Sequence, residues 1–140
     1  MLKGKVEDFK KILKENDFKC TSTRLKIIDI FFKNSKPISA EYIYSKLKND
    51  IDEATVYRTL SSFEKKGVLR RIDLRKSSIH FELNNHHHHH IICTKCGRIE
   101  DFEENKEIEK LLVKVVQDSS KFKSITEHSL ELFGLCKVCC

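Results

Sequence analysis

Hydrophobic residues recur at helical spacing in four segments of the first half of the chain. This period predicts amphipathic helices at 5–16, at 22–34, in a short stretch after Ser39, and at 53–66. Residues that commonly cap helix N-termini precede the last three segments: Thr21 or Ser22, Ser39 and Asp52. Gly67 is expected to stop the fourth helix.

Two β-rich runs follow, at 68–74 and 78–83, and Arg75-Lys76-Ser77 joins them. This pattern predicts a hairpin with a basic tip. Short helices followed by such a hairpin are typical of a winged helix-turn-helix domain, whose second motif helix enters the DNA major groove. In the fourth helix Arg58 points away from the apolar stripe, as this interpretation requires. An ordinary solvated helix face is the alternative.

The pattern changes after residue 85. An extended run at 86–93, a strand at 98–102, a helix at 108–119 and strand-like runs at 124–126 and 129–133 predict a small α+β unit with a thin core. Such a unit is expected to need a metal and a second copy of itself. The expected fold is therefore α+β, with a winged-helix DNA-binding domain at 1–84 and a small α/β dimerisation domain with structural zinc at 85–140.

Charge divides along the same line. Residues 1–85 carry 19 Lys and Arg against 12 Asp and Glu, whereas residues 86–140 carry 8 against 9. The basic first part predicts a polyanionic partner, which we expect to be double-stranded DNA. The chain shows no long apolar run and no signal-peptide pattern, so we expect a cytoplasmic protein with no membrane partner.

The cysteines are grouped in a way that favours metal over disulfides. Two Cys-x-x-Cys pairs are formed by Cys93, Cys96, Cys136 and Cys139. Four thiolates complete a tetrahedral zinc site that has no open position, so the predicted site is structural. Cys20 stands alone, and Cys140 is a spare thiol beside the second pair.

Five consecutive histidines, His86 to His90, precede the first cysteine pair. Because alternate side chains of a strand point to opposite faces, the run predicts two separate metal sites. His88 and His90 share one face, with Glu82 and Asp101 as plausible oxygen partners. A solvated polar linker is the alternative, although polyhistidine is a rare choice for one.

The opposite face of the same run carries His87 and His89. Its expected partners are His128 and an acidic residue of the following helix, either Glu109 or Glu107. Imidazole and carboxylate together suit several divalent metals. This face therefore predicts an additional metal site.

Three motifs resemble the ferric uptake regulator family. They are Thr55-Val56-Tyr57-Arg58-Thr59-Leu60, the histidine run into Ile92-Cys93-x-x-Cys96-Gly97, and His128-Ser129-Leu130-Glu131-Leu132-Phe133-Gly134-Leu135-Cys136-x-x-Cys139. The resemblance covers nearly the whole chain in the family's order and spacing. It implies a dimeric, metal-responsive transcriptional regulator, not an enzyme, with a winged-helix domain followed by a dimerisation domain.

The resemblance also implies roles for individual residues. Tyr57 and Arg58 match the family's base-contacting pair, Thr55 opens the same motif, and Lys19 matches its minor-groove lysine. The two cysteine pairs match the structural zinc site. Glu82, His88, His90 and Asp101 match the regulatory site, and His87, His89, His128 and a helix glutamate match the additional site. That glutamate falls on Glu109 if one residue is inserted after Phe102.

Two departures from the family pattern bear on the metal. Pro37 stands where the family often has a histidine that ligates the regulatory metal, and proline cannot ligate. His89 stands where iron-responsive members commonly have a carboxylate. The nitrogen-rich set favours zinc over Fe(II) or Mn(II) and is most similar to the family's zinc uptake regulator branch.

We therefore expect a homodimeric repressor that binds a palindromic operator when zinc is plentiful and so controls metal uptake genes. An iron, manganese or peroxide response is the alternative within the family. A zinc metalloenzyme and a metal-storage protein are alternatives of a different class. The first lacks a convincing general base or signal of a small-molecule substrate pocket, and the second leaves the Tyr57-Arg58 helix without a purpose.

Overall fold

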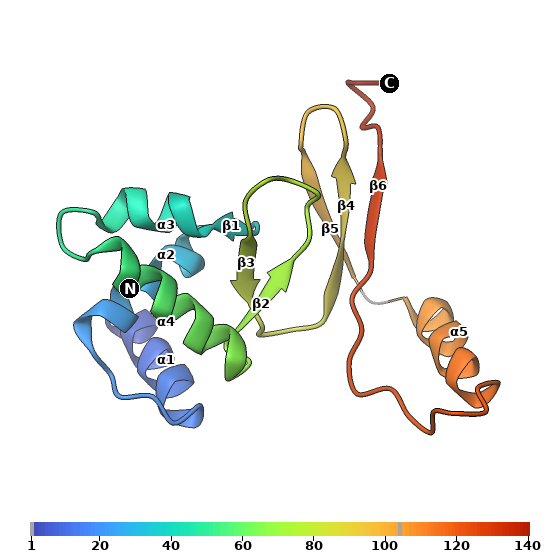
Figure 1. Ribbon diagram of the computed structural model, residues 1–140, viewed down its shortest axis with the longest axis horizontal. Helices are drawn as coiled ribbons and strands as arrows, with labels where there is room; N and C mark the ends of the chain where they lie inside the picture. The colour runs from blue at the N-terminus through green and yellow to red at the C-terminus, as the bar shows by residue number, and fades with distance from the viewer. Residues whose placement is uncertain (1, 104) are drawn as a thin grey trace. The chain divides into compact units, whose positions relative to one another are not determined.

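The chain divides into two compact units, Met1–Asn85 and His86–Cys140 (Figure 1). This computed structural model describes residues 2–103 and 105–140, with side chains from residue 6 onward. Both units combine helices with strands, which confirms the α+β class. None of the described helices is long and apolar enough to cross a membrane.

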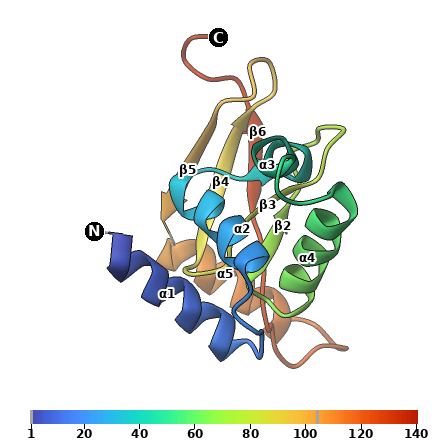
Figure 2. The same ribbon diagram turned by 90° about the vertical axis from the view of Figure 1, so that its left-hand side faces the viewer.

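Four helices make up most of the first unit (Figure 2). They are α1 Leu2–Glu15, α2 Ser22–Lys33, α3 Ala40–Leu47 and α4 Glu53–Lys65. The side chains of Thr21, Ser39 and Asp52 each accept a hydrogen bond from a backbone N–H three residues ahead, so all three predicted N-caps are confirmed. The fourth helix ends just before Gly67, whose φ of 76° places it in the left-handed region.

The first unit also contains a three-stranded antiparallel sheet. Its strands β1 Ile38–Ser39, β2 Leu69–Ile72 and β3 His80–Leu83 lie in the order β1-β3-β2. The predicted hairpin is thus present with shorter strands, and Arg75 at its tip has a positive φ of 52°. The sequence did not predict β1, because two residues are too few to show a period.

One hydrophobic cluster runs through the four helices and the sheet of the first unit. Leu13, Ile28, Ile43, Leu60 and Phe63 are among its fully buried members. Each such side chain contributes about 1.5–3 kcal/mol through burial. Because Val56, Leu60 and Phe63 fix one side of α4 in this core, its opposite side faces outward.

The second unit consists of β4 His88–Cys93, β5 Ile99–Glu103, α5 Lys106–Gln117 and β6 Glu131–Gly134. Its sheet has the order β5-β4-β6, with β4 antiparallel to β5 and parallel to β6. The parallel register sets Cys93 beside Gly134. The two cysteine pairs therefore follow neighbouring strands at the same edge of the sheet.

The structure corrects three expectations for this unit. The predicted strand at 124–126 is irregular, and β6 begins at Glu131, not at residue 129. Among the described residues, the 124–126 segment pairs with no strand, and the sheet of this unit consists of β5, β4 and β6. The histidine strand begins at His88, two residues later than predicted.

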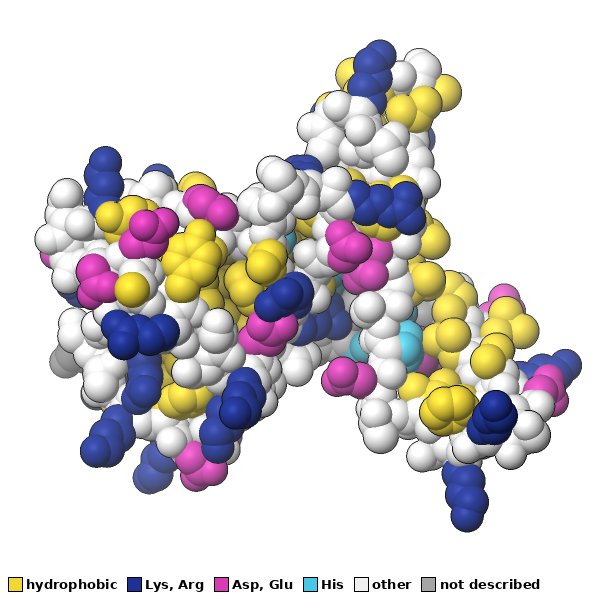
Figure 3. All heavy atoms as spheres, in the orientation of Figure 1, with side chains coloured by type: hydrophobic (Ala, Val, Ile, Leu, Met, Phe, Trp, Pro, Cys, Tyr) yellow, Lys and Arg dark blue, Asp and Glu magenta, His cyan; other side chains and the backbone are white. Residues whose placement is uncertain are grey.

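Little of the second unit is a hydrophobic interior. Among its described residues, the buried hydrophobic side chains are Ile92, Cys93 and Ile99, and α5 buries none. Hydrophobic side chains gather instead on its surface, notably over α5 (Figure 3). The most exposed are Leu111, Val115, Phe122 and Val138.

Candidate metal centres and nucleic-acid interface

The four cysteines of the two Cys-x-x-Cys pairs converge at one edge of the second sheet. The turn after β4 is closed by Gly97, whose N–H donates to the Cys93 carbonyl at 2.9 Å, and the turn after β6 by a Cys139 N–H bond to the Cys136 carbonyl at 3.0 Å. All four sulfurs lie within 4.8 Å of one another. Cys20 and Cys140 lie outside this group and are exposed.

The spacing and protonation of these thiols fit zinc. Cys96 Sγ and Cys136 Sγ are 3.8 Å apart, which equals the edge of a tetrahedron of sulfurs at about 2.3 Å from a central zinc. Backbone N–H groups of Cys136 and Cys96 directed at its sulfur lower the pKa of Cys93 to about 6. The pKa of Cys139 rises to about 12 because its S–H is hydrogen-bonded to the Cys136 and Cys96 sulfurs. Metal binding would release that shared proton.

A second group joins one face of β4 to α5 and to the segment before β6. Its members are His87, His89, Glu109 and His128, whose donor atoms also lie within 4.8 Å of one another. His128 Nε2 is 2.9 Å from Glu109 Oε1 and 3.0 Å from His87 Nε2. His87 Nε2 and His89 Nε2 are each 3.5 Å from the same carboxylate oxygen.

His89 carries the best indication that this group holds a cation. Its side chain is fully buried, and neither ring nitrogen makes a hydrogen bond to any described residue. Burial, with His87 nearby, lowers the pKa of His89 and favours the neutral imidazole, the form that ligates metals. A buried imidazole without hydrogen bonds is unfavourable by about 1–3 kcal/mol, and a metal ligand bond would remove that penalty.

The structure also decides between the two glutamates left open by the sequence. Asn105 caps α5 by accepting from the Glu107 N–H at 2.8 Å, which sets the helix so that Glu109 faces the histidines. Glu107 is exposed and lies outside the group.

The opposite face of β4 carries His88 and His90, with ring centroids 4.9 Å apart. Both are buried. Asp101 is the cross-strand partner of His90 on β5, and its Oδ1 lies 3.6 Å from His90 Nε2. Three of the four residues expected at the regulatory site therefore lie together in the second unit.

Glu82, the fourth expected residue, belongs to β3 of the first unit and has a partner that the sequence did not predict. It stands opposite Arg70 on β2, and the Arg70 Nε donates to Glu82 Oε1. Only 18% of the Arg70 side chain and 9% of the Glu82 side chain are exposed, so this is a largely buried ion pair. The hairpin register would have revealed it, because residues opposite each other in an antiparallel pair are direct neighbours.

Three of the expected DNA-contacting residues, Thr55, Tyr57 and Arg58, lie on α4, and the fourth, Lys19, precedes α2. Thr55 is tied to the Asp52 cap through a 2.6 Å hydroxyl bond, and Arg58 Nε donates to the Ala54 carbonyl at 3.3 Å. Tyr57 is 39% exposed, and its hydroxyl donates to Glu41 at 3.3 Å. Lys19 is exposed at the turn before α2, where its carbonyl accepts from Arg24. Basic side chains also project from the first unit in Figure 3.

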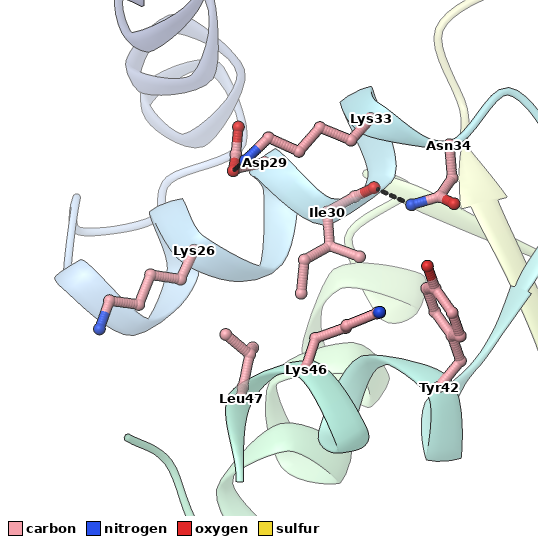
Figure 4. Close-up of a pocket in the computed structure, with 8 residues that line it drawn as sticks. All are labelled: Lys26, Asp29, Ile30, Lys33, Asn34, Tyr42, Lys46 and Leu47. Atoms are coloured by element: carbon pink, nitrogen blue, oxygen red, sulfur yellow. Dashed lines mark hydrogen bonds and ion pairs between the residues drawn. The ribbon is translucent and has the colours of Figure 1, made fainter. Parts of the chain in front are cut away.

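A hollow of about 380 Å³ between α2 and α3 is a weaker candidate for a site (Figure 4). Its cations already have partners: Lys26 bonds Asp50 at 2.8 Å, Lys33 pairs with Asp29, and Lys46 lies over the Tyr42 ring. The Asn34 amide donates to the Ile30 carbonyl. No buried donor or acceptor that lines the hollow is left unsatisfied among the described residues.

A helix-turn-helix with a hairpin, followed by a unit whose buried polar groups could hold metal ions, is the arrangement of a metal-responsive transcriptional regulator. The chain belongs to the ferric uptake regulator family, whose sequence model matches residues 15–133. Proteins of this family are transcription regulators, not enzymes, and they bind operator DNA as dimers.

Known relatives agree with this assignment. A ferric uptake regulation protein of Neisseria gonorrhoeae is 38% identical over 132 residues, which cover 91% of this chain and 90% of the relative. The structure of the Francisella tularensis ferric uptake regulator with iron is 38% identical, with a TM-score of 0.73 over 87% of this chain and 94% of that one.

The predicted similarity to the zinc uptake regulator branch is less well supported than membership of the family. A zinc uptake regulator complexed with zinc and DNA is 19% identical, with a TM-score of 0.71 over 98% of this chain and 93% of that one. This similarity shows the shared fold alone. The relatives at higher identity carry the names of iron regulators, so they favour the iron alternative over the zinc preference drawn from His89.

Proposed function

We propose that the chain is a dimeric, metal-dependent repressor of metal uptake genes that binds a palindromic operator, with Fe(II) as its regulatory metal. The observation that carries this proposal is β4 itself. Its two faces present separate ligand groups, and the strand follows the helix-turn-helix unit directly in the chain. Metal bound at such a position can bias how the first unit is held.

The regulatory group we propose consists of His88, His90 and Asp101 with Glu82 from the first unit. His87, His89, Glu109 and His128 form the additional group, and the four paired cysteines form the structural zinc site. A bound cation supplies a positive charge and fixed coordination geometry. The side chains supply imidazole nitrogens and carboxylate oxygens from the sheet and from α5.

DNA recognition is assigned to the outward side of α4. In this proposal Arg58 reads a guanine base edge, with Tyr57 packing beside it and Thr55 near the helix start. Lys19 and the basic β2–β3 tip supply sequence-independent phosphate contacts. Two such helices in a dimer match two half-sites about one DNA turn apart.

A second copy is expected to cover the exposed hydrophobic surface of α5. Leu111 and Val115 are one helical turn apart and are 64% and 67% exposed. Neither packs into the interior of its own unit, since α5 buries no residue. Apolar patches of this kind mark interaction surfaces.

Two observations bear on the metal and point in different directions. The names of the relatives favour Fe(II). The replacement of a carboxylate by His89 favours zinc, because imidazole suits zinc better than a hard oxygen ligand does. Zinc is therefore the second candidate.

Operator affinity measured across buffered free Fe(II), Mn(II) and Zn(II), with the cysteine zinc left in place, tests the proposal. We expect Fe(II) to raise affinity at least tenfold at the lowest free concentration. A lower threshold for Zn(II) would transfer the assignment to zinc. Equal DNA binding after removal of all exchangeable metal would contradict the proposal.

The same assay separates a repressor from a metal-storage protein. Arg58→Ala should weaken operator binding by about 1–3 kcal/mol, which is roughly fivefold to more than a hundredfold, and leave metal binding unchanged. Lys48→Ala, which removes an exposed cation outside the proposed contacts, is the matched control. A store would tolerate both changes equally.

A further inference from the structure

Arg70 and Glu82 form a largely buried ion pair within the first unit, between the strands β2 and β3. Glu82 is also the donor that the first unit contributes to the proposed regulatory group. A carboxylate this deeply buried needs a positive partner, because an uncompensated buried charge is strongly unfavourable. Arg70 supplies that partner when no regulatory metal is bound, so the hairpin does not depend on metal to compensate Glu82.

A bound metal ion and Arg70 use the same carboxyl group. The Arg70 Nε–H is directed at Glu82 Oε1, and the second carboxylate oxygen can ligate while the first still accepts. Two positive charges then lie only a few ångströms apart in a place largely shielded from water, where their repulsion is strong. If the pair breaks instead, the attraction between Arg70 and Glu82 is lost. By either route the charge of Arg70 weakens metal binding.

The hydrogen bond from Arg70 acts in the opposite direction, since it fixes the orientation of Glu82. Outer hydrogen bonds of this kind raise metal affinity by about 10–100-fold. A neutral donor would orient the carboxylate in the same way, whereas the repulsion arises only from the charge of the guanidinium. Replacing the guanidinium by an amide therefore separates the two effects.

We propose that Arg70 is a built-in competitor of the regulatory metal: its charge lowers metal affinity at Glu82 and so raises the metal concentration at which the protein responds. The inference rests on the proposed function, because Glu82 is a ligand only in the regulatory group named there. The coupling is reciprocal, so metal bound at Glu82 weakens the ion pair between β2 and β3 by the same factor.

Metal affinity in variants of the full chain tests the inference without DNA. Each protein keeps its cysteine zinc, and Co(II) is the probe, with the affinity of every exchangeable site measured by chelator competition. The site lost in Glu82→Gln is the one that contains Glu82. Arg70→Gln removes the charge but keeps an N–H donor, so affinity at that site should rise at least about tenfold. Arg70→Lys keeps the charge and should stay close to wild-type affinity.

Arg71→Gln is the matched control, because it removes the same charge from the next residue of β2. Successive side chains of a strand point to opposite faces, and Arg71 pairs with Glu64 and lies over the Phe81 ring. Its side chain is 52% exposed, so water screens its charge. Co(II) affinity should therefore be unchanged in Arg71→Gln.

A measurement on the wild type covers the case in which Arg70→Gln does not fold. The ion pair should protect the Arg70 Nε–H from exchange with water, and its NMR signal is assigned by its absence in Arg70→Lys. Zn(II), a diamagnetic probe, should speed up this exchange when it fills the exchangeable sites, because metal at Glu82 weakens the pair. The exchange of the Arg71 Nε–H should not change.

Unchanged or weaker Co(II) affinity in Arg70→Gln would overturn the inference and leave Arg70 with a positioning role alone. An Arg70 exchange rate that does not respond to Zn(II), or the loss of no site in Glu82→Gln, would also overturn it. Failure of the proposed function looks different. In that case the Co(II) affinities follow the expected order, but operator affinity of the wild type does not respond to metal.

Discussion

The first unit has an interior of hydrophobic side chains. In the second unit, by contrast, two of the three most deeply buried side chains of β4 are histidines: these three are His89, His90 and Ile92. Four helices and a sheet in the first unit share one continuous hydrophobic cluster. The second unit has a three-stranded sheet and a helix without any fully buried residue. The two units are thus stabilised by different interactions.

This difference in stabilisation matches the proposed functions of the two units. A unit that must present α4 rigidly gains from a core that is independent of metal supply. A unit that senses metal gains from an interior that is incomplete without one, because ligand binding then becomes folding free energy. The exposed apolar side of α5 adds a second dependence, on another copy of the chain.

The largest expected effect is the loss of one zinc ligand, which should destabilise the second unit and leave the first unit folded. Cys96→Ser leaves three thiols at the cysteine site, where a structural zinc contributes on the order of 10 kcal/mol. We expect amide hydrogen exchange to show β4, β5 and β6 unprotected while α1 to α4 remain protected. Cys20→Ser, an exposed thiol of the first unit, is the control. Protected β4 amides in Cys96→Ser would refute the metal dependence of this unit.

The converse change removes a core side chain from the first unit. Phe63 is fully buried and packs edge-on against Phe18 with ring centroids 5.1 Å apart. Phe63→Ala should lower the free energy of unfolding by about 3–5 kcal/mol. All three tyrosines, Tyr42, Tyr44 and Tyr57, lie in the first unit, so tyrosine fluorescence during denaturation reports that unit alone.

Zinc release to a chromophoric chelator reports the second unit in the same experiment and should be unchanged by Phe63→Ala. Ile79→Ala, which truncates a 46% exposed side chain, should shift neither signal by more than about 0.5 kcal/mol. Coupled loss of both signals in Phe63→Ala would mean that the units do not unfold independently.

A smaller effect is expected at the surface of α5. Val115→Lys places a charge on the proposed dimer surface and should weaken self-association at least tenfold, because burying an apolar side chain of this size is worth about 1.5 kcal/mol. Sedimentation equilibrium measures it. Ile79→Lys makes the same change on an exposed position of the first unit and should leave the dimer intact.

The smallest expected effect is a pH dependence confined to the second unit. Burial lowers the pKa of His89 below its unfolded value of about 6.5, with the charges of His87 and His128 opposing and Glu109 favouring protonation. The unfolded chain then binds more protons, so stability is full above that pH and falls as the pH drops toward the folded pKa.

Zinc-loaded protein without exchangeable metal should therefore release its cysteine zinc at lower denaturant concentration at pH 5.5 than at pH 7.5. His89→Gln should reduce this dependence, whereas His80→Gln should preserve it. If the pH dependence of zinc release were unchanged in His89→Gln, groups other than His89 would be responsible for the proton uptake.

Local signals explain which parts of the fold the sequence predicted. The helices and their caps at Thr21, Ser39 and Asp52 depend on residues within one turn, and their boundaries agree with the structure to within a few residues. Strand β1 and the irregular 124–126 segment depend on distant partners, which no local pattern records.

The candidate sites divide in the same way. Because side chains alternate along a strand, the sequence predicted that His87 and His89 lie on one face and His88 and His90 on the other. The structure shows the same two pairs. The choice of Glu109 depends on where Asn105 starts α5, and the Arg70–Glu82 pair on a cross-strand register. Neither relation is visible before the strands and helices are placed in space.

Parallel pairing of β4 with β6 gives this chain an order of events during synthesis. Residues 1–85 can fold as soon as they leave the ribosome, since domains generally fold in turn from the N-terminus. Strand β4 must wait for Gly134, and Cys96 for Cys136, 40 residues downstream. At about 5–20 residues per second, that wait lasts a few seconds. During it, each nascent chain presents a finished winged helix that has no metal sensor and no partner.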